Sequence, residues 1–181
     1  MKKILVVVDM QNDFIDGALG TKEAEAIVPA VIEKIKTYAP DCIYATRDTH
    51  GENYLQTQEG KNLPVPHCIK GTDGWEVRPE IAAAMPQAVY VDKPSFGSPA
   101  LAHMLSALFM KECEGDPERM EIELAGLCTD ICVVSNALLL KAAMPEVKIS
   151  VDAACCAGVT PQSHSAALTT MQMCQIEVKN Q

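Results

Sequence analysis

Positive charge and long apolar runs are scarce in this sequence of 181 residues. Its 15 lysines and arginines are outnumbered by 24 aspartates and glutamates, and the net charge of -9 disfavours nucleic acids and anionic membranes as partners. The first apolar run ends at Asp9, which makes it too short for a signal peptide or a membrane span. We therefore expect a cytoplasmic protein without membrane partners, whose eight cysteines are reduced thiols.

Several familiar motifs are also absent. No C-x-x-C occurs, which disfavours a redox pair and a zinc hook built from paired cysteines. No G-x-G-x-x-G follows the first predicted strand, which disfavours a dinucleotide ligand. There is no internal repeat or low-complexity tract, and 48% of the residues are hydrophobic. We expect one globular domain over residues 1–181, large enough to bury a full core.

Short apolar segments alternate with helical ones along the chain. The first of them, KILVVVD, is rich in valine and typical of a strand that is buried on both faces. This alternation predicts an α/β, three-layer, Rossmann-like fold with a mostly parallel sheet of about six strands flanked by helices. The six predicted strands are residues 3–9, 42–48, 88–93, 120–127, 148–154 and 175–180.

Helix signals separate most of these strands. Ser98 and Thr160 each precede a proline, a pattern that predicts an N-cap followed by the first helical residue. The segment ICVVSNALLLKAAM is apolar nearly all round, so we expect a deeply buried helix there. The stretch from His50 to Asp73 is long and irregular, and such a loop is usually functional. One face of the first helix is predicted to carry Ile27, Val31, Ile35 and Tyr38.

Charged and nucleophilic side chains follow the predicted strands. Parallel sheets bind ligands at the carboxyl ends of their strands. Asp9 ends the first strand, Asp48 the second and Lys93 the third, while the fourth runs into Cys128 and Cys132. These carboxylates, an ammonium group and thiols should therefore lie along one edge of the sheet.

Cys128 and Cys132 allow two interpretations. Cys132 is expected in the first turn of a buried helix, where the helix dipole favours a thiolate that could act as a nucleophile beside backbone N–H groups. Most free cysteines, however, are small buried hydrophobic residues, and the pair could be that alone. The segment by itself does not decide between them.

Three segments together resemble the isochorismatase-like cysteine hydrolase superfamily: VVVDMQNDF, VDKPSFGS and GLCTDICV. The resemblance covers essentially the whole chain. It implies a catalytic triad of Asp9, Lys93 and Cys132, and a cis peptide bond between Leu127 and Cys128 that turns the Cys128 N–H toward the substrate. Such a bond costs about 3 kcal/mol outside proline and would be a strained, functional feature. Members often form dimers or higher oligomers, so a homo-oligomer is possible.

The loop RDTHGENYLQTQEGKNLPVPHC carries a second set of polar residues. Two imidazoles and carboxylates suit one divalent ion such as Zn²⁺, Mn²⁺ or Fe²⁺. The loop resembles the metal loop of the nicotinamidase/pyrazinamidase branch, which implies Asp48, His50, Glu59 and His67 as ligands. Glu52 is close enough in sequence to compete with Glu59. The remaining histidines, at positions 103 and 164, are expected to be packing or surface residues.

The resemblance implies a hydrolase of linear amides that cleaves nicotinamide to nicotinate and ammonia through a thioester. The branch often has an aromatic residue before the metal histidine, where this chain has LPVPHC. Ring stacking would then come from Phe14, Tyr54 or Phe96, or from Trp75. Two alternatives stay open: a cysteine hydrolase acting on another small amide, carbamoyl or ureido compound, and a non-enzymatic metal or thiol sensor.

Overall fold

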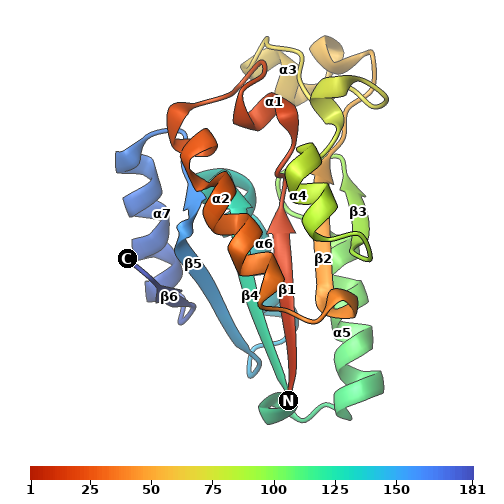
Figure 1. Ribbon diagram of the computed structural model, residues 1–181, viewed down its shortest axis with the longest axis vertical. Coiled ribbons are helices and arrows are strands. Elements are labelled where there is room, and N and C mark those ends of the chain that lie inside the picture. The colour runs from red at the N-terminus through yellow and green to blue at the C-terminus, as the bar shows by residue number, and fades with distance from the viewer.

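The computed structural model describes residues 1–181, with one central sheet between two layers of helices (Figure 1). All neighbouring strands are parallel, in the order β3-β2-β1-β4-β5-β6. The predicted three-layer α/β fold is therefore confirmed. The strands are β1 (Lys2–Val8), β2 (Ile43–Asp48), β3 (Val89–Lys93), β4 (Met120–Leu127), β5 (Lys148–Ala157) and β6 (Glu177–Lys179).

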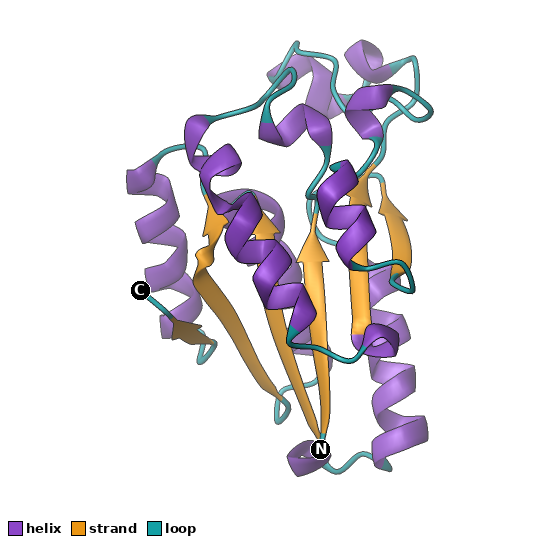
Figure 2. Cartoon of the chain, in the orientation of Figure 1, coloured by secondary structure: helices purple, strands orange, loops and turns teal.

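Helices connect the strands and cover both faces of the sheet, as Figure 2 shows. Parallel neighbours require such crossover connections. No helix is both long and apolar enough to cross a membrane. The helices are α1 (Asn12–Ile15), α2 (Lys22–Lys36), α3 (Gln58–Asn62), α4 (Pro79–Ala84), α5 (Pro99–Cys113), α6 (Val134–Ala143) and α7 (Pro161–Met173), and a π-helical turn, η5 (Thr129–Val133), precedes α6.

The alternation of side chains along β1 builds the two cores. Ile4, Val6 and Val8 join one apolar cluster, which also contains buried residues of α5, α6 and α7. Leu5 and Val7 point the other way and join the cluster formed with α2 and α4. Successive residues of a strand face opposite sides, so a strand covered on both faces must be apolar throughout. This explains the run of valines that identified β1 in the sequence.

The helix boundaries follow their predicted caps. The hydroxyl of Ser98 accepts a hydrogen bond from Leu101 N, and Thr160 forms a capping box at the start of α7. Ala24, Ile27, Val31 and Ile35 form the buried face of α2. Tyr38 lies just beyond α2, which ends at Lys36, but it packs partly buried against the same apolar cluster.

The segment after β4 differs from the expected deeply buried helix. It begins as the π-helical turn η5 and continues as α6, whose outward residues Leu138 and Leu139 are only half-buried. The helical layer is one helix thick, so one side of α6 remains near solvent. The predicted irregular stretch from His50 to Asp73 also contains structure, because α3 lies within it.

Candidate active site

The predicted polar residues gather at the carboxyl edge of the sheet, where the loops and the short helices α1 and α3 collect (Figure 1). The chain builds β2 and β3 on one side of β1 and then places β4 on the other. Ligands bind at such a change of direction in open α/β sheets. Asp9 directly follows β1, Lys93 ends β3 and Cys132 lies in η5. The fold thus brings together three residues that are far apart in sequence.

Asp9, Lys93 and Cys132 form one buried cluster. Lys93 Nζ lies 2.7 Å from Asp9 Oδ2 and 3.4 Å from Cys132 Sγ. Thr46 donates its hydroxyl proton to Asp9 Oδ1 at 2.6 Å. Asp9 and Lys93 are at most 1% exposed, and Cys132 is 5% exposed. This arrangement holds the ammonium group between a carboxylate and a thiol, away from bulk water.

Burial controls the protonation of this cluster. It raises the pKa of Asp9, and the Asp48 carboxylate adds to this while Lys93 opposes it. Burial alone would lower the pKa of Lys93, but the negative charges of Asp9 and Asp48 outweigh it and raise that pKa. Burial and Asp9 raise the pKa of the Cys132 thiol well above its usual range. The expected dipole-stabilised thiolate is therefore not the resting state, because desolvation outweighs the helix terminus.

Every peptide bond of the chain is trans, including the one between Leu127 and Cys128. The expectation of a cis bond before Cys128 is therefore wrong. The backbone changes course at Gly126 instead, whose φ of 123° is a conformation that only glycine adopts readily. A β-carbon there would lie 2.1 Å from the carbonyl oxygen of Val8, so glycine also allows β4 to approach β1 closely.

Cys128 precedes the turn that carries Cys132. Its carbonyl oxygen accepts hydrogen bonds from the N–H groups of Ile131 and Val133, at 3.1 and 3.0 Å. Its own N–H is a donor in none of the turn, loop or cap hydrogen bonds of the backbone. Burial raises the pKa of its thiol to about 12, so the thiol is protonated and uncharged at neutral pH.

Thr129 anchors this turn to α7 through a side chain that the sequence did not single out. Thr129 is fully buried, and its hydroxyl lies 2.8 Å from Nδ1 of His164. The neighbouring Asp130 accepts a hydrogen bond from Val159 N at 3.1 Å. His164 was expected to be a packing or surface residue, and its contact links η5 to the last helix of the fold. No local pattern signals a pair 35 residues apart.

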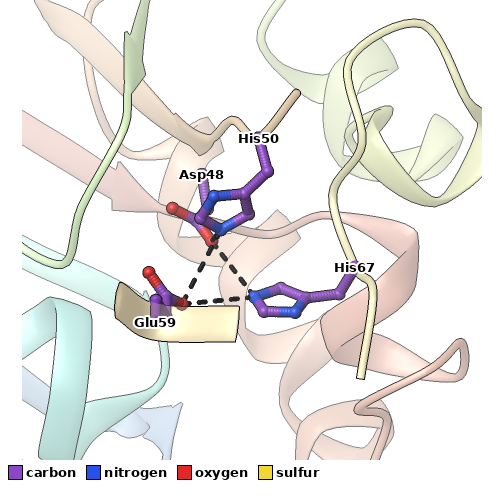
Figure 3. Close-up of side chains that lie close together, drawn as sticks. All are labelled: Asp48, His50, Glu59 and His67. Atoms are coloured by element: carbon purple, nitrogen blue, oxygen red, sulfur yellow. Dashed lines mark hydrogen bonds and ion pairs between the residues drawn. The ribbon is translucent and has the colours of Figure 1, made fainter. Parts of the chain in front are cut away.

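Figure 3 shows four side chains that converge beside this cluster: Asp48, His50, Glu59 and His67. One ligand atom from each lies within 4.8 Å of all the others. His50 Nε2 is 2.8 Å from Asp48 Oδ2 and 3.7 Å from Glu59 Oε1, and His67 Nε2 is 3.4 and 3.6 Å from the same atoms. Two imidazole nitrogens and two carboxylate oxygens are a donor set that suits Zn²⁺ and related divalent ions.

The surroundings of the four residues also fit a metal site. His67 Nδ1 lies 2.8 Å from the carbonyl oxygen of Val65, which can only accept, so Nδ1 carries the proton and Nε2 faces the cluster. Hydrogen bonds from the two histidines, together with Lys93, outweigh burial and lower the pKa of Asp48. Glu52 is exposed and lies outside the cluster, so the structure places Glu59 there instead.

Two further residues, Gln11 and Asp13, position this cluster. Gln11 is fully buried and clamps the backbone of Asp48, donating to its carbonyl oxygen at 2.9 Å and accepting from its N–H at 2.7 Å. Asp13 accepts a hydrogen bond from Cys68 N at 2.7 Å, so it ties the loop after β1 to the segment that carries His67. A glutamine next to a buried strand end was the available signal for Gln11.

A small cavity of about 50 Å³ joins the two clusters. Phe14 and Phe96, two of the residues expected to stack on a substrate ring, line it. Tyr54 does not line it, because its ring packs against His50 and His67 at centroid distances of 4.7 and 5.0 Å. Trp75 is also elsewhere, with Arg47 stacked 4.0 Å from its ring centroid. The other lining residues are Leu19, Asp48, Glu59, Leu63, His67, Cys128, Ile131 and Cys132.

Comparison with known proteins agrees with this geometry. The isochorismatase domain matches residues 3–180, and the chain belongs to the isochorismatase family. The nicotinamidase/pyrazinamidase of Mycobacterium tuberculosis is 26% identical over 189 residues, and the alignment covers 97% of each chain.

Solved structures of the same fold include two that bear on the site. The Pyrococcus horikoshii pyrazinamidase in complex with zinc superposes with a TM-score of 0.73 at 26% identity and covers 100% of both chains. The N-carbamoylsarcosine amidase of Thermoplasma acidophilum has a TM-score of 0.70 at 27% identity, covering 99% of this chain and 96% of its own. These similarities extend over the whole sheet and both helical layers.

Proposed function

We propose that the protein is a metal-dependent cysteine amidohydrolase that cleaves nicotinamide to nicotinate and ammonia. One observation carries the proposal: Cys132 and three of the four metal-binding candidates, Asp48, Glu59 and His67, line the same small cavity. A thiol that can attack a carboxamide thus lies beside a group that can hold the rest of the substrate. The family and its relatives support the wider class, a hydrolase acting on amides.

The first step transfers the Cys132 proton to Asp9. The raised pKa values of both groups keep the proton on sulfur at rest and make Asp9 a stronger base than an ordinary carboxylate. Lys93 stays protonated and lies 3.4 Å from the sulfur, so it stabilises the thiolate as it forms. The thiolate then attacks the carboxamide carbon, and a thioester forms as the C–N bond breaks.

The oxyanion formed in this step is assigned to the backbone N–H groups of Cys128 and Cys132. The peptide bond before Cys128 is trans, and the assignment of its N–H rests on the absence of this group from the turn, loop and cap hydrogen bonds of the backbone. Loss of one such donor typically costs about 3 kcal/mol of transition-state stabilisation. Asp9 returns the proton to the departing ammonia, and water then cleaves the thioester to release the acid. Lys93 also balances the charge of Asp9 throughout, since the two form an ion pair at 2.7 Å.

Asp48, His50, Glu59 and His67 would hold one divalent ion, either with Glu59 bound directly or through water. Such an ion would supply a Lewis acid for a ring nitrogen of the substrate. The four residues thereby orient the carboxamide toward Cys132. Orientation of this kind can contribute several kcal/mol to lowering the barrier, on the order of 7 in favourable cases.

The test compares initial rates of ammonia release from nicotinamide, pyrazinamide, benzamide and N-carbamoyl compounds at matched concentration. Nicotinamide should be hydrolysed far faster than benzamide, because benzamide has the carboxamide but no ring nitrogen. Equal rates for these two compounds would exclude a role of the ring nitrogen. Metal binding without turnover of any amide would instead indicate a sensor.

A second candidate is a hydrolase of carbamoyl or ureido compounds. The observation that favours it is the part of the cavity wall formed by Leu63 and Ile131, which is aliphatic, whereas Phe14 and Phe96 line the rest. Aliphatic walls give a flat ring less stacking than an aromatic residue would. A carbamoyl compound with the highest rate in the same panel would replace nicotinamide as the substrate.

A further inference from the structure

The small cavity lies next to a larger groove. The groove has a volume of about 480 Å³, roughly ten times that of the inner cavity by the same measure. Cys132, Asp48 and His67 line the inner cavity alone. The two spaces are adjacent and share four lining residues, which we define as the mouth: Glu59, Leu63, Phe96 and Ile131.

The groove beyond this mouth is more polar than the inner cavity. Gln58 and Asn62 are four residues apart on α3, so their side chains lie on the same side of that helix. Both line the groove, both are exposed, and neither side chain makes a hydrogen bond within the protein. The hydroxyl of Thr57 also lies there, but it already bonds the carbonyl oxygen of Tyr54 and the N–H of Gly60. Two neutral amides are thus available to a ligand.

The geometry of the proposed substrate leaves one ring position free of both anchors. With the ring nitrogen at the metal-binding residues and the carboxamide at Cys132, ring position 2 lies between the two anchors. Position 5 is directly across the ring from position 2, and it points away from both. A substituent at position 5 would therefore leave through the mouth toward the groove.

Resting on the proposed function, we infer that the groove is a second binding subsite, which takes a short polar substituent at position 5 of a nicotinamide-type substrate. Leu63 and Phe96, which are 39% and 44% exposed, would contact the first carbon of the substituent at the mouth. The amides of Gln58 and Asn62 would then bind a hydroxyl group or another neutral polar end. The substrate class extends from the unsubstituted ring to 5-substituted amides with a hydrogen-bonding end.

Two substrates of nearly equal size test this inference: 5-(hydroxymethyl)nicotinamide and 5-ethylnicotinamide, which differ by a hydroxyl group in place of a methyl group. For the wild-type enzyme we expect kcat/KM to be about fivefold higher for the hydroxymethyl compound, the effect of one neutral hydrogen bond. In the Gln58→Ala/Asn62→Ala double variant the ratio should fall to about one. Lys61→Ala is the matched control, because Lys61 is exposed on α3 without lining the groove, and it should keep the wild-type ratio.

Three results would overturn the subsite. These are turnover of nicotinamide without turnover of either 5-substituted compound, a wild-type ratio of one or less, and a ratio that survives in the double variant. Nicotinamide itself is measured in parallel. If the wild-type enzyme fails to hydrolyse nicotinamide, the proposed function fails first and the subsite falls with it.

Discussion

Replacement of Lys93 by methionine should destabilise the protein through the carboxylate that it leaves behind. Lys93 is 1% exposed. Its Nζ lies 2.7 Å from the carboxylate of the fully buried Asp9 and 3.4 Å from that of Asp48. Removing one partner of a buried ion pair costs about 3–5 kcal/mol. For a chain of this length we expect Tm to fall by roughly 10 °C.

The double variant Asp9→Asn/Lys93→Met tests whether the cost comes from unpaired charge. Asparagine suits position 9, since the φ of 48° there lies in the left-handed region that asparagine tolerates best after glycine. It also keeps an oxygen that can accept the Thr46 hydroxyl proton. The neutral pair should recover about 2 kcal/mol relative to the sum of the two single variants.

The Lys93→Met deficit should also depend on pH. Burial already raises the pKa of Asp9 above its usual range, and loss of Lys93 removes the charge that opposes this shift. The folded variant then binds a proton more tightly than the unfolded chain, so its stability falls as pH rises above the ordinary pKa of aspartate. The loss of unfolding free energy relative to wild type should be small near pH 4 and largest at neutral pH, and these pH values hold to about one unit.

Urea unfolding followed by tryptophan fluorescence measures these differences, because Trp75 is the single tryptophan and is buried. All variants should be compared after chelation, so that metal binding does not contribute to stability. Additive costs in the double variant, or a deficit that grows toward acid pH, would refute the reasoning.

Three other predictions concern the nucleophile, the metal and the buried charge of β4. Cys132→Ala should lower kcat on the order of 10⁴-fold or more, whereas Cys128→Ala keeps its N–H and should retain most activity; the reverse result would exchange their roles. Elemental analysis should find about one divalent ion per wild-type chain and none in His50→Ala or His67→Ala, and full occupancy in both would exclude the site. Burial alone would raise the pKa of Glu123, but hydrogen bonds from two lysines lower it. Glu123→Gln should therefore have a lower free energy of unfolding than wild type at pH 7, as measured by urea titration. This difference should shrink toward pH 4, where the carboxylate of the wild type becomes protonated. A difference that stays constant with pH would show that the carboxylate is not paired.

The sequence by itself determined the sheet and the order of its strands along the chain. A strand covered on both faces had to be apolar on both, which made the run of β1 conspicuous. The caps of α5 and α7 were equally local, since Ser98 and Thr160 each satisfy N–H groups within three residues. The metal-binding candidates were also visible, because Asp48 and His50 lie two residues apart in one loop.

Only the tertiary structure decided how these residues meet and how they are charged. The trans bond before Cys128, the position of Tyr54 behind the histidines and the choice of Glu59 over Glu52 depend on packing between distant segments. The protonation of Cys132 depends on burial, which no local pattern reveals. Hydrophobic periodicity is a property of neighbouring residues, so the sequence could predict which residues make up the site. Desolvation and the convergence of distant side chains are properties of the folded chain, so only the structure shows how those residues are arranged and protonated.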